Sequence, residues 1–298
     1  MATTSNDNGR ALEYKLVEEM SRFFQRNISL TQRCKIDQQR DQIKYTNLPE
    51  SKQAYFSSGS KKILRWLEDS HNLSQTSFTV DRLPDSEGVN GDPTDIRITL
   101  NESGQQINLS AKHNNKSLKH PRVAPFVEHL GFSSDYIEAK LYRQMVKDVS
   151  NNFYDEANKL KPDCLKFKEL LSINPDFVND HLYEPITSYI VNNLGFSDDS
   201  NVTNKLFKYL TGLNVDYYQV LVNAKTVHVY AYENIPNPTT FRSKMIDRSN
   251  FIIGFDNGWE MNLRIHTASS RISDCNKNSC SLKLDVTLSK STIKAYIL

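Results

Sequence analysis

The chain has 298 residues, of which 38% are hydrophobic and 24% are charged, and its formal net charge is +2. This length allows one large hydrophobic core or a core with a subdomain. The small net charge excludes a globally basic nucleic-acid-binding protein, so any DNA-binding field has to be local.

Nothing in the sequence predicts a membrane protein or a secreted one. No apolar run is long enough to span a bilayer, and the first ten residues lack the basic start and apolar centre of a signal peptide. We therefore expect a cytoplasmic protein without a membrane partner. The four cysteines, Cys34, Cys164, Cys275 and Cys280, fit a reducing compartment, where disulfides are rare. Cys275 and Cys280 would need two more ligands to bind zinc, and no CxxC or nearby His pair supplies them.

The amino-terminal part is predicted to be helical. Apolar residues recur on one face between residues 6 and 24, and a second helix is predicted over residues 50–70. Glu13 lies near the start of the first helix, where it either interacts with the helix dipole or supports an active site. Residues 84–93 are rich in Asp, Gly and Ser and form a loop.

Two short strands joined by a turn follow that loop. Residues 96–100 alternate between apolar and polar, Gly104 breaks the turn, and residues 107–111 form the returning strand. Asp95 precedes the first strand and Lys112 follows the second. A carboxylate and an amine are therefore expected at the same edge of the hairpin.

This pair has the chemistry needed for phosphodiester hydrolysis. A divalent metal held by Asp95 would neutralise the phosphate, and Lys112 would orient the nucleophile or stabilise negative charge. The arrangement resembles the core of the PD-(D/E)xK nucleases, with Ser110 where that core usually has an acid. Serine is a poor metal ligand, so a second carboxylate has to come from elsewhere. Glu128 is the first candidate and Glu13 is the second.

A basic segment directly follows the candidate lysine. The sequence LSAKHNNKSLKHPR, residues 109–122, contains no acidic residue. Beside a metal site, such a segment favours a clamp for DNA phosphates over the alternative of a solvated basic turn. The predicted DNA contacts are His113, Asn114, Lys116, Lys119 and Arg122.

The pattern changes from helix to strand in the second half of the chain. Residues 133–212 read as several helices without a chemical motif, whereas YYQVLVN, TVHVYAY, NFIIGF, EMNLRIHTA and SLKLDVTL read as strands. Asn257-Gly258 predicts a hairpin between the third and fourth of these. The polar residues here either read DNA bases or are ordinary outward-facing positions of a sheet. The candidate DNA contacts are Asn262, Arg264, His266, Ser269, Ser270 and Arg271.

Four segments in order along the chain resemble the HaeIII-type type II restriction endonucleases. They are NGRALEYKL (8–16), GDPTDIRI (91–98), LSAKHNNKSLKHPR (109–122) and NGWEMNLRIHTASSRI (257–272) with the following SLKLDVTL. The resemblance implies a Mg²⁺-dependent enzyme that cuts double-stranded DNA at a short palindrome and leaves 5′-phosphates, with Asp95 and Lys112 catalytic. It also implies a DNA methyltransferase of the same specificity as functional partner. A homodimer would match the twofold axis of a palindrome.

The expected fold is α/β, with a restriction-endonuclease-like core. We expect a single endonuclease domain over residues 1–298, in which a mixed central sheet flanked by helices forms a catalytic core (1–132). A helical region (133–212) and a β-rich DNA-recognition region (213–298) would follow. Two alternatives are a repair or defence nuclease with the same core and no fixed target sequence, and a non-catalytic DNA-binding protein. The serine at position 110 keeps the second alternative open.

Overall fold

The computed structural model describes residues 5–84, 87, 92–114, 117–272, 275 and 280–298. The chain forms two compact units. The first combines Met1–Lys116, Gly212–Ile235 and Ile293–Leu298, and the second combines Ser117–Thr211 and Pro236–Thr292. The units are thus interleaved along the chain, and the strands after residue 213 are divided between them.

The first unit is built on a seven-stranded mixed sheet in the order β1-β2-β3-β4-β6-β7-β12. The pairs β1–β2 and β4–β6 are parallel, and the other pairs are antiparallel. The expected mixed sheet is therefore confirmed, and the predicted hairpin forms its third and fourth strands, β3 and β4. The strands are β1 (Ile28–Leu30), β2 (Phe78–Arg82), β3 (Ile96–Leu100), β4 (Gln106–His113), β6 (Tyr217–Val222), β7 (Val227–Tyr232) and β12 (Lys294–Ile297).

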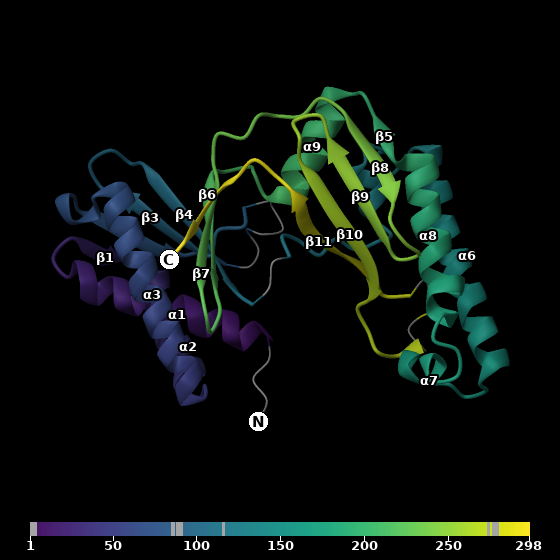
Figure 1. Ribbon diagram of the computed structural model, residues 1–298, viewed down its shortest axis with the longest axis horizontal. Coiled ribbons are helices and arrows are strands. Elements are labelled where there is room, and N and C mark those ends of the chain that lie inside the picture. The colour runs from purple at the N-terminus through teal and green to yellow at the C-terminus, as the bar shows by residue number, and fades with distance from the viewer. Residues whose placement is uncertain (1–4, 85–86, 88–91, 115–116, 273–274, 276–279) are drawn as a thin grey trace. The chain divides into compact units, whose positions relative to one another are not determined.

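Three long helices accompany this sheet, followed by a short 3₁₀ turn (Figure 1). They are α1 (Ser5–Phe24), α2 (Gln32–Thr46), α3 (Glu50–His71) and the turn η1 (Leu73–Gln75). The sequence predicts α1 and α3 because each has an apolar stripe. It does not predict α2, since Cys34 and Asp41 are the residues of that helix that are buried. The N-cap of α2 is Thr31, whose Oγ1 accepts a hydrogen bond from the backbone N–H of Cys34 at 3.1 Å.

The core of the first unit lies between these helices and the sheet. Its buried side chains come from α1, α3 and five of the strands, and include Leu12, Val17, Leu64, Val80, Ile98, Leu109, Val220 and Val229. Gly59 on α3 lets the helix approach β6 and β7 closely. A Cβ atom there would lie 2.8 Å from Cγ1 of Val222 and 3.3 Å from Cγ2 of Val227.

The second unit contains a five-stranded antiparallel sheet in the order β11-β10-β9-β8-β5. The Asn257-Gly258 hairpin joins β9 to β10 as predicted, with Gly258 at φ +86°. The strands are β5 (Phe196–Ser197), β8 (Phe241–Met245), β9 (Asn250–Phe255), β10 (Glu260–Thr267) and β11 (Leu282–Lys290).

The helices of the second unit come from the middle of the chain, as the sequence predicts. They are α5 (Phe126–His129), α6 (Ile137–Leu160), α7 (Phe167–Leu171), α8 (Glu184–Tyr189) and α9 (Ser200–Thr211), with π-helical turns η2 (Asn179–Tyr183) and η3 (Ile190–Leu194) beside α8. The α6 helix continues without a break through the polar residue Ser150, which is buried and whose Oγ donates to the Val146 carbonyl at 2.7 Å. On α9, Phe207 packs edge-on against Phe255 of β9 and against Trp259 in the hairpin that follows it.

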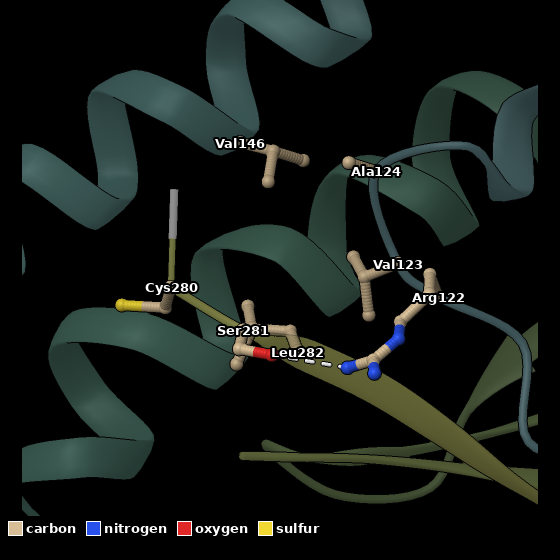
Figure 2. A pocket seen from close by; sticks show the side chains of 7 residues that line it. All are labelled: Arg122, Val123, Ala124, Val146, Cys280, Ser281 and Leu282. Atoms are coloured by element: carbon tan, nitrogen blue, oxygen red, sulfur yellow. Dashed lines mark hydrogen bonds between the residues drawn. The ribbon is translucent and has the colours of Figure 1, made fainter. Parts of the chain in front are cut away.

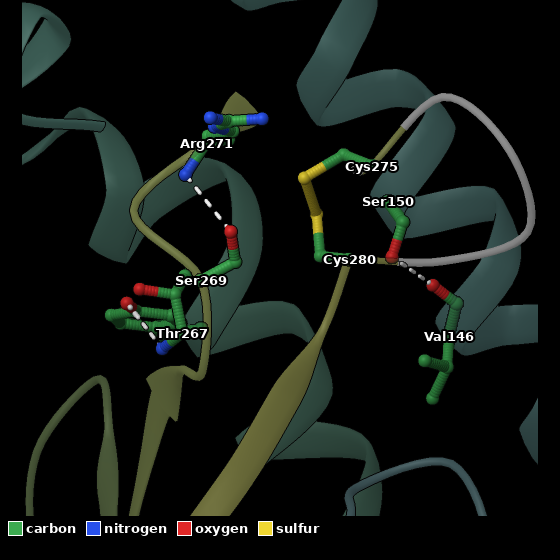
Figure 3. The surroundings of a disulfide bond; sticks show 8 residues. Val146, Ser150, Thr267, Ser269, Arg271, Cys275 and Cys280 are labelled. Atoms are coloured by element: carbon green, nitrogen blue, oxygen red, sulfur yellow. Dashed lines mark hydrogen bonds between the residues drawn. A yellow bond between two sulfur atoms is a disulfide. The ribbon is translucent and has the colours of Figure 1, made fainter. Parts of the chain in front are cut away.

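The structure contains a disulfide, although the cysteine content predicted a reducing compartment in which disulfides are rare. Cys275 and Cys280 form a disulfide (Figure 3), so neither thiol is available to zinc. The sequence alone does not predict this disulfide, since two cysteines five residues apart can be either bonded or free. Cys34 and Cys164 are buried free thiols. Among the described residues, no helix is long and apolar enough to cross a membrane.

The close approach at Gly59 predicts opposite effects for two glycine substitutions in helices. Gly9 on α1 has no atom within 4 Å of an added Cβ, so Gly9→Ala should stabilise the protein by about 0.5–1 kcal/mol through helix propensity. Gly59→Ala should lower the free energy of unfolding by about 1–3 kcal/mol, because Val222 has to move. Urea unfolding of both variants measures this. Equal stabilisation by the two substitutions would show that α3 can shift without cost.

Candidate active site

Asp95 lies immediately before β3, where the antiparallel pairing with β4 fixes its position. Ile96 is the partner of Leu109, which places Asp95 beside Ser110. The Asp95 backbone N–H donates to the Leu109 carbonyl at 2.9 Å, and its carbonyl accepts from the Leu83 N–H on the other side at 3.0 Å. Asp95 is therefore held by backbone bonds from both neighbouring strands.

The Asp95 carboxylate points at the residues that the sequence predicts. Its Oδ2 accepts from the Ala111 backbone N–H at 2.7 Å and from Ser110 Oγ at 3.3 Å. Lys112 Nζ lies 3.8 Å from the same oxygen, and both side chains are partly exposed. The hairpin thus brings Asp95, Ser110 and Lys112 together, with Ser110 as a hydrogen-bond donor.

Glu13 lies close to this group from α1. Desolvation by burial, followed by the negative charge of Asp95, raises the pKa of Glu13 to about 7, against the lowering effect of Arg82. The Arg82 guanidinium donates from Nη2 to Glu13 Oε2 at 2.6 Å. A second carboxylate is therefore near enough to Asp95 for the two like charges to oppose each other's ionisation.

These side chains have the chemistry to hold a divalent metal ion such as Mg²⁺. Mg²⁺ is bound by oxygen ligands and typically takes one or two protein carboxylates, with waters and substrate phosphates completing its shell. Asp95 and Glu13 supply two carboxylates whose repulsion a cation would relieve. In the part of the chain that the structure describes, no group of three or more His, Cys, Asp or Glu residues could hold a metal.

Glu128, the other candidate ligand, lies on α5 in the second unit. Its carboxylate is paired with the guanidinium of Arg143 on α6, and 42% of its side chain is exposed. Asp95 and Lys112 belong to the first unit. The charge of Glu128 is therefore already balanced by Arg143, within the second unit.

Comparison with known proteins shows the family of this chain. The sequence profile of the HaeIII restriction endonuclease family matches residues 9–235, which include Glu13, Asp95 and Lys112. The chain belongs to the HaeIII restriction endonuclease family. It is also 23% identical to the type II restriction enzyme HaeIII of Haemophilus aegyptius, over 97% of this chain and 95% of that protein. No solved structure is significantly similar to it.

Membership of a restriction endonuclease family identifies the protein as a DNA-binding hydrolase that acts as a nuclease. The resemblance to this family that the four sequence segments indicate is thereby confirmed. Members of such families use divalent metal ions, so the pair of acids beside Lys112 has the chemistry that this family needs.

The basic segment after Lys112 begins with a residue, His113, that is packed against the protein itself. His113 Nε2 lies 2.7 Å from the Tyr55 hydroxyl, and its ring packs against the rings of Tyr55 and Phe56 on α3. Burial and the charge of Lys52 lower the pKa of His113, which favours a neutral imidazole. Asn114 is exposed at φ +57°, and Lys116 lies outside the described residues.

Lys119 and Arg122 belong to the second unit. Lys119 Nζ lies 4.1 Å from the centre of the Tyr209 ring, and burial lowers its pKa. Arg122 Nη1 donates to Ser281 Oγ at 3.0 Å, at the rim of a cavity of about 260 Å³ whose lining also includes Val123, Val146 and Cys280 (Figure 2). Both cations therefore have partners within their own unit.

The candidate DNA-reading residues of β10 form a charged cluster with β11. Arg264 Nη2 lies 2.8 Å from Asp285 Oδ2, and His266 Nε2 and His120 Nδ1 lie 2.9 Å and 2.6 Å from Asp285 Oδ1. Burial opposes the ionisation of Asp285, but hydrogen bonds from Arg264 and His266 and the charge of His266 lower its pKa to about 2. Three basic groups thus surround one carboxylate, while Asn262, two residues before Arg264, shares their face.

Ser269, Ser270 and Arg271 follow β10 in an irregular segment (Figure 3). The Arg271 backbone N–H donates to Ser269 Oγ at 3.1 Å, and the Ser270 carbonyl accepts from the Phe167 N–H at 3.2 Å. A bridge between Arg271 and Lys166 fixes the same segment. Its backbone is therefore tied to the start of α7, while the side chain of Arg271 is exposed.

Three residues of these clusters have no signal in the sequence. Arg82 donates a hydrogen bond to Glu13 and another to Asp41. Asp285 is the carboxylate that the basic residues of the β10 cluster contact. Asp41 lies on a helix with few apolar residues, and Arg82 takes the third position of the buried face of β2, after Phe78 and Val80. In both places a charged residue is normally expected to face solvent. Asp285 occupies an ordinary polar position of an alternating strand, and only its pairing opposite Arg264 distinguishes it.

The environment of His113 predicts that its loss mainly affects stability. His113→Gln should lower the free energy of unfolding by about 1–3 kcal/mol, since it removes a hydrogen bond and two ring contacts. Gln106→Ala, at the exposed start of the same strand, should change it by less than about 0.5 kcal/mol. Denaturant unfolding measures both. A stable His113→Gln variant with a weaker salt dependence of DNA binding would instead assign His113 to a phosphate contact.

Proposed function

We propose that this protein is a type II restriction endonuclease that hydrolyses both strands of double-stranded DNA at a short palindromic sequence. The reaction would depend on Mg²⁺ and leave 5′-phosphates. The observation that carries the proposal is the convergence of Asp95, Lys112 and Glu13 in a chain that belongs to a restriction endonuclease family. A carboxylate pair beside an amine is the minimal set for metal-assisted phosphodiester cleavage.

Each residue of the set has a role that follows from its position. Asp95 and Glu13 would hold the ion, which when bound supplies charge neutralisation and a more acidic water. Lys112 would place its positive charge beside the phosphate and stabilise the negative charge that develops during cleavage. The Ala111 N–H and Ser110 Oγ keep the Asp95 carboxylate oriented, which lowers the reorganisation needed in the reaction.

We assign the second carboxylate to Glu13 rather than to Glu128. The mutual charge effect of Glu13 and Asp95 supports this choice, because it requires the two groups to be close. Glu128 is exposed and neutralised by Arg143, so it has little need of a metal. Its proposed role is to join α5 to α6.

The proposed DNA contacts combine backbone and base contacts. Asn114, Lys116 and Arg122 are proposed to contact phosphates, with His113 and Lys119 supporting the same segment from more buried positions. The face of β10 with Asn262, Arg264 and His266, and the segment Ser269, Ser270 and Arg271, are proposed to contact base edges. Arginine pairs with guanine and asparagine with adenine in the major groove.

A palindromic target has further consequences for the protein. Its twofold symmetry is matched most simply by a homodimer, in which each copy cuts one strand. A cell that contains such a nuclease has to protect its own DNA, so we propose a methyltransferase of the same specificity as functional partner. Both would act in the cytoplasm, where the chromosome and invading DNA are accessible.

The decisive experiment is digestion of unmethylated phage DNA by the purified protein with Mg²⁺ and with EDTA. Discrete fragments that need Mg²⁺ and have a common end sequence would support the proposal. Heterogeneous ends would indicate a nuclease without a fixed target sequence. A salt-sensitive mobility shift without cleavage would indicate a non-catalytic DNA-binding protein.

Substitutions in the proposed metal site should separate catalytic from supporting residues. Asp95→Asn and Glu13→Gln should each reduce cleavage at least about a hundredfold, because each removes a charged metal ligand. Ser110→Ala and Glu128→Gln should keep cleavage within about tenfold, because the Ala111 N–H still binds Asp95 and Glu128 interacts with Arg143. Initial rates at saturating DNA measure the effect, and circular dichroism checks the fold. Loss of cleavage in Glu128→Gln with full activity in Glu13→Gln would reverse the assignment.

Substitution of an exposed arginine on the β10 face should weaken DNA binding and leave the fold intact. Arg264 is 55% exposed and meets Asp285 across the strand pair. Arg264→Gln should weaken binding to the cognate sequence by about 1–3 kcal/mol in the absence of Mg²⁺. Arg242 on β8, which stacks on Phe196, provides a matched control in the same sheet, and Arg242→Gln should bind normally. Fluorescence anisotropy measures both, and equal affinities would show that this face does not read DNA.

A further inference from the structure

A buried group of charges lies behind Glu13. Arg82, at the end of β2, is 1% exposed and donates from Nη2 to two carboxylates, Glu13 Oε2 at 2.6 Å and Asp41 Oδ2 at 2.9 Å. Its Nη1 donates to Gln38 Oε1 at 3.3 Å. One guanidinium therefore connects three elements: α1 through Glu13, α2 through Asp41 and Gln38, and β2, to which it belongs.

Asp41, the second carboxylate that Arg82 binds, is itself fixed by other basic residues. Asp41 is fully buried, and it accepts a two-pronged pair of hydrogen bonds from Arg40, at 2.9 Å from Nε and 2.6 Å from Nη2. Lys44 Nζ lies 3.7 Å from its other oxygen, Oδ1. Although burial disfavours the charged carboxylate, hydrogen bonds from Arg40 and the charge of Arg82 lower the pKa of Asp41. Asp41 is thus an ionised anchor against which Arg82 is oriented.

Arg82 is also coupled to Asp95 through the backbone. It pairs with Ile96 across β2 and β3, and the N–H of the next residue, Leu83, donates to the Asp95 carbonyl at 3.0 Å. The same short stretch of β2 therefore fixes the main chain of Asp95 and the side chain of Glu13.

The network leaves Glu13 able to bind a cation. Within the described part of the chain, Arg82 is the residue that hydrogen-bonds Glu13, and it does so through Oε2. The other oxygen, Oε1, remains available on a carboxylate whose orientation is already set. A buried ion-pair network of this kind adds little net stability over a well-packed apolar group, so stability alone does not explain it.

We propose that Arg82, oriented by Asp41, is a positioning residue for the metal site: it holds the Glu13 carboxylate facing Asp95 so that the two bind one divalent ion. This inference rests on the proposed function, because it requires Glu13 to be a metal ligand. Outer partners of metal ligands set ligand orientation, and their loss typically costs 10-fold to 100-fold in metal affinity or activity.

Two substitutions weaken the network at different points. Arg82→Lys keeps the charge but loses the fork that binds both acids at once. Asp41→Asn keeps the shape but removes the charge that orients Arg82. Each should lower the affinity for Mg²⁺ about 10-fold to 100-fold, whereas cleavage at saturating Mg²⁺ should recover most of the wild-type rate. Arg33→Gln is the matched control, because the pair of Arg33 with Asp81 also joins α2 to β2 but does not contact Glu13.

The primary measurement is metal binding by the full-length protein without DNA. Terbium luminescence, with Mg²⁺ as the displacing ion, gives the affinity independently of cleavage. Arg82→Lys and Asp41→Asn should show the loss of affinity, and Arg33→Gln should not. The double variant Glu13→Gln with Arg82→Lys should bind no more weakly than Glu13→Gln alone, because Arg82 acts through Glu13.

The outcomes separate this inference from the proposed function. If Glu13→Gln binds Mg²⁺ as the wild type does, Glu13 is not a ligand and the proposed metal site is wrong. If Glu13→Gln loses affinity but folded Arg82→Lys and Asp41→Asn keep it, the positioning role is overturned and the metal site stands. A lowered thermal stability with unchanged Mg²⁺ affinity in these two variants would also overturn it, because it would make the network purely structural.

Discussion

The site depends on one interaction, the hydrogen bond from the Ala111 backbone N–H to the Asp95 carboxylate at 2.7 Å. It can form only in the register that pairs Ile96 with Leu109, since a shift of one residue would turn every side chain of β4 to the other face. The apolar alternation of both strands enforces that register by burying Ile98 and Leu109. Core packing thereby fixes the position of a partly exposed carboxylate.

Charge is the second constraint on the site. Glu13 and Asp95 repel each other in a poorly solvated position, and the protein compensates with Arg82 behind one acid and Lys112 beside the other. Arg82 is shared with Asp41, so it only partly neutralises Glu13. The residual negative charge between the two acids is what a divalent cation would neutralise.

The sequence predicts those parts of the site that local chain geometry determines. Asp95 and Lys112 lie at the ends of one hairpin, so their proximity follows from strand alternation and a turn. Glu13 is predicted on the correct helix, but its approach to Asp95 depends on how α1 packs, which no local pattern encodes. Arg82 and Asp41 are missed for a stronger reason: buried charges look like surface charges in a sequence, and α2 has almost no apolar face.

The division of the chain into two units separates the chemistry from the proposed reading of DNA bases. The family profile ends at residue 235, where the second segment of the first unit also ends, and β8 to β11 lie beyond it. The proposed catalytic residues thus lie inside the part of the chain that the family profile matches, and Arg264, His266 and Asp285 lie outside that part. Hydrolysis of a phosphodiester makes the same demands whatever the target, whereas recognition of bases has to differ between targets. The sheet of the second unit could therefore change its surface residues without disturbing the hairpin that positions Asp95.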